Sequence, residues 1–201
     1  GATAERGLYD VLLGGLLLAE AVVPPATPGV DLVPATPALA RAEVELRDRL
    51  ALRKALHGLD PGRWRYVLLD APPSLTALSV GAMAAARELL VPVECHVLAL
   101  NGLRQLFQAV ELARQQLNPE LRVAGLLGCR VNRTRHSRAV LEELRKHFGN
   151  QVLQATVRES TRLAEAPSFR KPITLHDPEG HGAEDYRALA AEIIRQEVKG
   201  W

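Results

Sequence analysis

Short apolar runs alternate with longer segments of helical periodicity along this 201-residue chain. Parallel strands need crossover connections, so such alternation is typical of a mostly parallel sheet with helices on both faces. The sequence therefore predicts the α/β class, and the absence of a long linker favours a single domain over residues 1–201. Strands are expected at 30–34, 66–69, 89–93, 123–127 and 152–157, and helices at 7–18, 37–58, 74–87, 100–117, 137–148 and from about 183 onward.

The segment 66–74 joins an apolar run to an aspartate and a double proline. Tyr66 to Leu69 lead directly into Asp70, and Pro72-Pro73 follow, which predicts a buried strand that ends where Asp70 emerges. Ligands of open α/β sheets bind at the carboxyl ends of the strands, where a carboxylate can organise a metal ion or its waters. Asp70 is therefore a candidate metal-site residue. An aspartate that caps the following helix is the alternative interpretation, and this stretch alone leaves both open.

The composition is that of a globular chain, with 47% apolar and 24% charged residues. Only 4% of the residues are aromatic, so the core is expected to consist of Leu, Val and Ala. Cys95 and Cys129 lie in apolar strand-like runs without metal-ligand spacing, which predicts buried thiols in a reducing compartment. The run Leu12 to Leu18 is interrupted by two glycines, and we expect neither a membrane span nor a signal peptide.

Positive charge is concentrated between Arg122 and Lys171, where eleven Lys or Arg residues accompany four Glu. The whole chain carries only +2, so the remainder is acidic. Arginine supplies 21 of the 25 basic residues, and its planar fork favours bidentate contacts with phosphate. A solvated basic surface explains the same pattern without a partner.

Five motifs occur in one order along the chain: Asp70–Leu75, Arg162–Ser168, Lys171–Ile173, Asp177-Pro178, and Gly182-Ala183 followed by Tyr186. Together they resemble the ParA/Soj family of chromosome and plasmid partitioning ATPases, over essentially the whole chain. The resemblance implies a P-loop ATPase fold of the ParA/MinD type. It also implies a homodimer that sandwiches ATP and Mg²⁺, binds DNA without sequence preference and hydrolyses ATP when a ParB-type partner stimulates it.

The phosphate-binding loop with which members of this family begin does not occur in the 201 residues. Gly14-Gly15 is followed by three leucines and cannot cradle a phosphate. The resemblance places the missing first strand beside the strand that leads to Asp70, so inner edges of the sheet are expected to be unpaired. A natural start upstream, a proteolysed or engineered fragment, and a relative that lost its loop are the three explanations. The chain as printed is expected to bind no ATP and to be inactive as an ATP hydrolase.

The resemblance implies nucleotide-site roles for three residues. Asp70 corresponds to the Walker B aspartate, which holds a magnesium-bound water, and Pro72 with its neighbour shapes the switch segment that senses the γ-phosphate. Asn132 follows a strand, where related ATPases use asparagine to read the adenine edge. A turn-forming asparagine is the alternative. At Val157-Arg158-Glu159 the chain departs from the family's Ile-Pro-Arg.

Basic residues are assigned to DNA in the same way. Arg133 and Arg162 align with arginines that carry nonspecific DNA binding in the family, and Arg158, Arg170 and Lys171 extend the expected patch. Contacts of this kind go to phosphates, so they give affinity without sequence preference and weaken with salt. A plain surface charge is the alternative interpretation for each of these residues.

The closing helix carries an apolar stripe, with charges of both signs, including Asp185 and Glu192, expected on the opposite side. The stripe comprises Tyr186, Leu189, Ala190, Ile193, Ile194 and Val198. A membrane-binding helix has a predominantly basic polar face, so docking against the domain is expected and a membrane is not a predicted partner.

Two functions of different classes follow from these observations. The first is a ParA-type ATPase of DNA segregation, cytoplasmic and associated with the nucleoid. The second is a nucleotide-independent DNA- or partner-binding module that has lost its ATPase activity.

Overall fold

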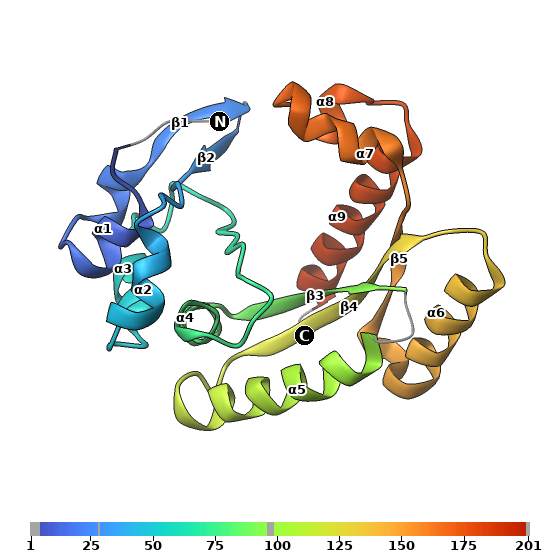
Figure 1. Cartoon of the computed structure of the whole chain (residues 1–201), viewed down its shortest axis with the longest axis horizontal. Coiled ribbons are helices and arrows are strands. Elements are labelled where there is room, and N and C mark those ends of the chain that lie inside the picture. Colours follow the sequence, from blue (N-terminus) through green and yellow to red (C-terminus); the bar gives the residue numbers. More distant parts are fainter. Residues whose placement is uncertain (1–4, 28, 96–98, 200–201) are drawn as a thin grey trace. The chain divides into compact units, whose positions relative to one another are not determined.

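The computed structural model describes residues 5–27, 29–95 and 99–199, which form two compact units (Figure 1). The first unit takes the described residues up to Arg87 together with Leu106–Leu121. The second takes those of Glu88–Gln105 and Arg122–Trp201. Each unit has a sheet of its own.

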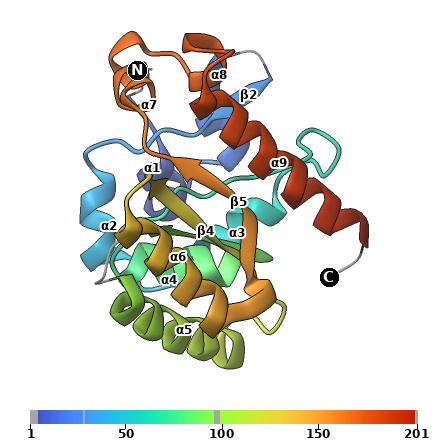
Figure 2. The same ribbon diagram turned by 90° about the vertical axis from the view of Figure 1, so that its right-hand side faces the viewer.

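The second unit is built on a parallel sheet in the order β3-β4-β5. Its strands are β3 (Glu88–Glu94), β4 (Arg122–Val131) and β5 (Val152–Arg158). Helices α6 (Arg135–Phe148) and α9 (His181–Lys199) lie on opposite sides of β5 (Figures 1 and 2). The predicted α/β class, with helices on both faces of a parallel sheet, is confirmed.

Strand β4 packs against α9 on one face of the sheet and against α6 on the other, because successive side chains of a strand point to opposite faces. Leu127 packs with Leu189 of α9 in one buried cluster. Gly128 faces the other way, where an added Cβ would come within 3.0 Å of Leu141 in α6. A glycine at this position therefore lets α6 approach the sheet closely.

Shorter helical segments complete the second unit. They are η2 (Gly149–Gln151), α7 (Thr161–Glu165), η3 (Ala166–Phe169) and α8 (Ile173–His176). Helix α5 (Ala99–Gln116) begins in the second unit and ends in the first. None of the helices in the described ranges combines the length and apolarity that a bilayer crossing requires.

The first unit is mainly helical, with one antiparallel pair of strands. Its elements are α1 (Leu8–Leu13), η1 (Leu18–Ala21), β1 (Val23–Thr27), β2 (Val30–Leu32), α2 (Leu39–Glu45), α3 (Ala51–His57) and α4 (Ala77–Ala85). Asn118 is buried and its Nδ2 donates to the carbonyls of Met83, at 2.9 Å, and Ala86, at 2.6 Å. This side chain satisfies carbonyls at the end of α4 that have no partner within the helix.

The single helix predicted over 37–58 is wrong, because the chain forms α2 and α3 with a turn between them. Asp48 lies in that turn, where its carboxylate accepts from the Leu50 amide at 2.9 Å and from Lys54 Nζ at 2.6 Å. Such local bonds compete with helical hydrogen bonds. The helix predicted from Ser74 begins instead after Thr76, whose amide donates to Ser79 Oγ.

The buried strand predicted over 66–69 is also wrong. The segment has no regular secondary structure, and Tyr66, Val67 and Leu68 are 43%, 52% and 92% exposed. A strand is held by hydrogen bonds to a neighbouring strand, and no strand in the described part of the chain pairs with residues 66–69. An apolar run alone does not supply that neighbour.

Candidate functional site

The carboxyl end of the three-stranded sheet is shaped by a bulge at Arg130. Cys129 and Val131 pair with the consecutive residues Val157 and Arg158, so β4 carries one extra residue there. Arg130 has a φ of 52°, an uncommon conformation for a residue with a side chain. Bulges of this kind turn a side chain in a new direction. The Arg130 side chain is thereby directed to the ends of both neighbouring strands.

The Arg130 guanidinium links these strand ends by charge. It lies 3.4 Å from Glu94 Oε1, at the end of β3, and 3.5 Å from Glu159 Oε1, just after β5. The two carboxylates, Glu94 foremost, raise the pKa of Arg130. All three side chains are exposed, so the pairs contribute little to stability in water.

Asn132 uses its carboxamide to build the turn that starts α6. Its Oδ1 accepts from the amide and the hydroxyl of Thr134, at 3.2 and 2.6 Å, and its Nδ2 donates to Glu159 Oε2 at 3.3 Å. Thr134 Oγ1 in turn accepts from the Ser137 amide at 3.1 Å and caps the helix. This geometry favours the turn-forming interpretation. Reading of an adenine edge by Asn132 stays a prediction.

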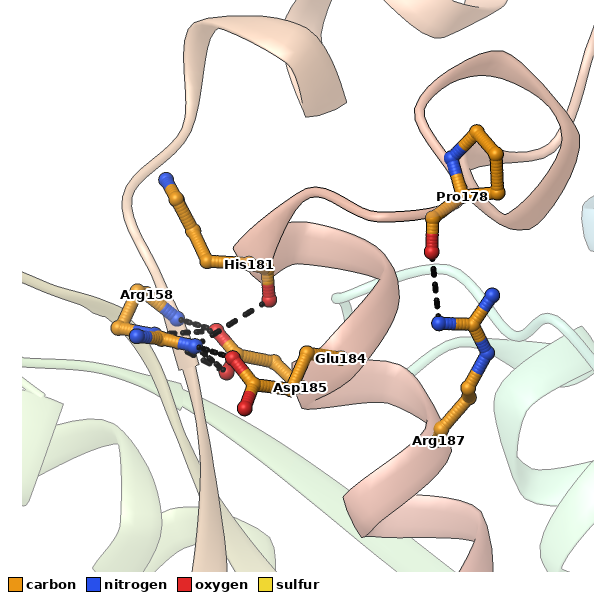
Figure 3. A network of polar contacts seen from close by, with 6 residues as sticks. All are labelled: Arg158, Pro178, His181, Glu184, Asp185 and Arg187. Carbon is orange, nitrogen blue, oxygen red and sulfur yellow. Dashed lines mark hydrogen bonds and ion pairs between the residues drawn. The ribbon is translucent and has the colours of Figure 1, made fainter.

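Arg158 is held by acidic residues of α9 (Figure 3). Its Nη2 lies 2.6 Å from Asp185 Oδ1 and from Glu184 Oε2, and its backbone amide donates to Asp185 Oδ2 at 2.9 Å. Asp185 is buried, and its hydrogen bond is the main cause of the raised pKa of Arg158. The charge of Arg158 is thus balanced by two carboxylates within the protein.

A second carboxylate of α9 binds the backbone of β5. Between the pairs Leu126 with Val152 and Gly128 with Thr156, β5 carries two extra residues. The amides of Gln154 and Ala155 donate to the two oxygens of Glu192, at 2.9 and 2.7 Å.

The predicted placement of Asp185 and Glu192 on the outer side of α9 is therefore wrong, since both face β5. Their spacing of seven residues is the signal that they share one helix face. Sequence reasoning missed this role because it assigned charged residues to solvent. The helix itself docks on β5, as predicted.

The other predicted DNA contacts are exposed side chains of the second unit. Arg133 follows β4, and Arg162 lies in α7, which follows β5, so both come after the carboxyl ends of adjacent parallel strands. Arg162 Nη1 lies 3.1 Å from Glu165 Oε2. Arg170 and Lys171 follow η3 and form no ion pair within the described ranges.

Asp70 and Pro72 belong to the first unit, whereas Asn132 and the basic residues belong to the second. Asp70 is exposed and forms no hydrogen bond or ion pair with any described residue. Among residues 5–27, 29–95 and 99–199, no cluster of three His, Cys, Asp or Glu side chains could hold a metal ion. Of the three predicted nucleotide-site residues, Asp70 alone offers Mg²⁺ a free carboxylate. Mg²⁺ commonly completes its coordination with water and nucleotide phosphates.

Comparisons with known proteins show which relatives this chain has. The model of a protein family described as an AAA domain matches residues 2–123. The chromosome partitioning protein ParA of Caulobacter vibrioides is 40% identical over 98% of this chain and 76% of its own length. The chromosome-partitioning ATPase Soj of Thermus thermophilus is 45% identical over 96% of this chain and 76% of its own length.

A solved structure has the same fold. Cobyrinic acid a,c-diamide synthase from Mycobacterium smegmatis, with bound ADP and magnesium, superposes with a TM-score of 0.82 at 30% identity. The match covers 98% of this chain and 74% of that protein.

Proposed function

The chain belongs to the ParA/Soj family of chromosome-partitioning ATPases, and on this premise we propose that it acts in DNA segregation. An ATP-dependent homodimer would bind DNA without sequence preference, and a ParB-type partner would stimulate its hydrolysis of ATP. The protein would act in the cytoplasm, on the nucleoid. Identity of 40–45% to named partitioning proteins, over nearly the whole chain, is the observation that carries this proposal. The amide synthase named above is less similar, at 30%.

The nucleotide part of the proposal assigns one role to each candidate residue. Asp70 would hold a water bound to Mg²⁺, Pro72 would shape the segment that senses the γ-phosphate, and Asn132 would face the adenine. The free carboxylate of Asp70 fits its role, since no described residue competes for it. The carboxamide of Asn132 would first have to leave Thr134 and Glu159. Glycines and a lysine that grip a triphosphate are absent from these 201 residues.

The DNA part of the proposal relies on exposed cations. Arg133, Arg162, Arg170 and Lys171 are solvent-accessible and able to reach phosphates. Arg158 would contribute least, because releasing it would leave the buried Asp185 without its partner.

The test is binding of a short labelled DNA duplex by the 201-residue chain and by Arg162→Gln. Without nucleotide the chain is expected to bind the duplex only weakly, and Arg162→Gln is expected to weaken that binding further for every duplex sequence and to lower the slope of log affinity against log salt by about 1. Arg114→Gln is the matched control, because Arg114 also pairs with a glutamate three residues away and is comparably exposed. Equal binding by both variants would contradict the assignment of Arg162.

Adding Mg-ATP to the same titration separates the two classes of function. The ATPase proposal expects the 201 residues alone to bind no Mg-ATP, because they lack the phosphate-binding loop. Salt-sensitive DNA binding that is complete without nucleotide would favour the nucleotide-independent module. Tight Mg-ATP binding by these residues would contradict the account of the phosphate-binding loop.

A further inference from the structure

His176 ends the short helix α8, which packs against α7, η3 and α9 (Figure 1). Its side chain is only 11% exposed. Phe169 of η3 stacks on the imidazole, with 4.8 Å between the ring centroids and 29° between the ring planes. The Nε2 atom is buried and has no hydrogen-bond partner among the described residues. Such an atom requires an explanation, because most buried polar atoms in folded proteins are hydrogen-bonded.

Glu165, the last residue of α7, lies between this nitrogen and Arg162. Its Oε2 atom is 3.1 Å from Arg162 Nη1 and 3.9 Å from His176 Nε2. A hydrogen bond to nitrogen needs about 2.7–3.2 Å, so Glu165 binds Arg162 and only approaches His176. A movement of about 1 Å by this oxygen would exchange one partner for the other.

The other charged groups around α8 have different partners. The segment η3 contains no titratable residue. In α9, Glu184 and Asp185 bind the guanidinium of β5 described above, and Arg187 donates to a backbone carbonyl. The Asp177 carboxylate lies against the loop before α9. Within the described ranges, Glu165 is therefore the one carboxylate at ion-pair distance from His176.

Protonation of the His176 ring changes what it offers to Glu165. A neutral ring whose Nε2 carries no proton has no donor to offer the carboxylate. A protonated ring has an N–H group at both nitrogens and a positive charge, which attracts a carboxylate and also the face of an aromatic ring such as Phe169. Free imidazoles change charge near about pH 6.5, so such an exchange falls in the physiological range.

We propose that Glu165 and His176 together control how readily Arg162 binds a DNA phosphate. While His176 is neutral, Glu165 binds Arg162 and offsets its charge. Once His176 is protonated, Glu165 turns toward the imidazolium and Arg162 is released. The local charge rises by one even if the carboxylate bridges both cations. DNA binding therefore strengthens as the pH falls.

The choice of DNA as the ligand of Arg162 rests on the proposed function. Glu165 and His176 are positioning residues in this scheme, because they act on DNA only through Arg162. A merely structural role for either residue would change stability without linking DNA affinity to pH.

The test measures binding of the labelled duplex by the 201-residue chain at about pH 8 and about pH 6, the range in which imidazoles titrate. We expect the weak binding to be about two- to fivefold tighter at the lower pH, the gain expected from releasing a surface ion pair. His176→Phe keeps a ring that can stack but takes no proton, so it should lose this gain. Glu165→Gln should bind at the higher pH as tightly as the unsubstituted chain does at the lower.

A comparable set at the end of α6 supplies the matched controls. Glu143 lies 3.4 Å from His147 Nδ1 and 3.7 Å from Lys146 Nζ, so a carboxylate again lies beside an imidazole and a cation. We expect His147→Phe to keep the pH-dependent gain and Glu143→Gln to leave binding at the higher pH unchanged.

A second measurement needs no DNA. Ring ¹⁵N chemical shifts report the protonated fraction of His176 at a fixed pH. We expect Arg162→Gln to raise that fraction, because it frees Glu165 for the ring, and Glu165→Gln to lower it. Unchanged fractions in both variants would overturn the inference whatever the DNA measurements give.

The outcomes separate this inference from the proposed function. Equal pH dependence in His176→Phe and in the unsubstituted chain, or an equal loss in His147→Phe, overturns the inference. If Arg162→Gln still weakens binding in that case, the DNA-binding proposal stands without the pH link. If the unsubstituted chain binds no duplex at either pH, the DNA-binding proposal falls and this inference falls with it.

Discussion

At the scale of single residues, the two cysteines show that adjacent chain segments can direct neighbouring side chains into different environments. The Cys95 amide donates to the Cys129 carbonyl at 3.2 Å, so the backbones are adjacent. Cys129 packs against the cluster that contains Leu189 of α9. The Cys95 sulfur lies beside Gly128 and Ser137, on the side of α6. The thiols therefore occupy opposite faces of the sheet and cannot form a disulfide without moving the backbone.

Burial raises the pKa of Cys95 and raises that of Cys129 to about 11. In the Cys95→Ser variant, we expect Cys129 to react with a thiol reagent about a hundredfold more slowly than a free cysteine at pH 8, because only the thiolate reacts. The rate should rise about tenfold per pH unit until about pH 11. A rate that levels off near pH 9 would contradict this prediction.

The raised pKa of Cys129 also makes the free energy of unfolding depend on pH. Its pKa is higher in the folded than in the unfolded state, so the unfolded chain loses its proton first as the pH rises. The contribution of the Cys129 thiol to the free energy of unfolding is present in full below about pH 9 and is lost between about pH 9 and 11. Denaturant unfolding of Cys129→Ala should lack this contribution to the pH dependence.

At the scale of elements, α9 docks on β5 through carboxylates as well as through apolar contacts. Asp185 and Glu192 accept hydrogen bonds from backbone amides of a strand whose extra residues leave the regular ladder. Backbone donors without partners are costly when water cannot reach them. The two acids therefore position the helix and satisfy the strand at once.

Glu192→Gln tests this docking, because a carboxamide offers one acceptor oxygen where two amides donate. We expect the variant to lower the free energy of unfolding by about 0.5–1.5 kcal/mol, the net contribution of one hydrogen bond that water can partly replace. Denaturant titration would measure the change, with Glu142→Gln on the exposed face of α6 as the control. Similar losses for both variants would show that Glu192 has no special role.

Hydrophobic periodicity predicted the helices and strands that pack against a neighbouring element. It failed where no neighbouring strand is present, and where a local side-chain hydrogen bond interrupts a helix. Strands β3, β4 and β5 and helix α6 lie within a few residues of the predicted ranges, because apolar spacing records which face is buried. The strand at 66–69 and the helix through Asp48 failed for the reasons given above. In the site, composition indicated the exposed arginines, whereas the positive φ of Arg130 leaves no mark in the sequence.

At the scale of the whole molecule, apolar side chains are found on the surface as well as in the core. Leu68 is 92% exposed and Leu126 is fully buried. Consecutive exposed apolar residues such as Tyr66 to Leu68 favour association with other apolar surfaces.

We expect Leu68→Lys to leave the unfolding midpoint within experimental error and to reduce binding of an apolar dye. Leu126→Lys is the contrasting control and should lower stability severely, because it buries a charge. Dye binding and denaturant titration on the same samples would check both effects. A large loss of stability in Leu68→Lys would mean that this side chain is packed.

The acidic residues of α9 have a consequence for how the molecule can be extended. Since they occupy the amides of Gln154, Ala155 and Arg158, these donors are not available to an incoming strand. Among the described residues β3 pairs only with β4, so its other edge is a place where a further strand could be added.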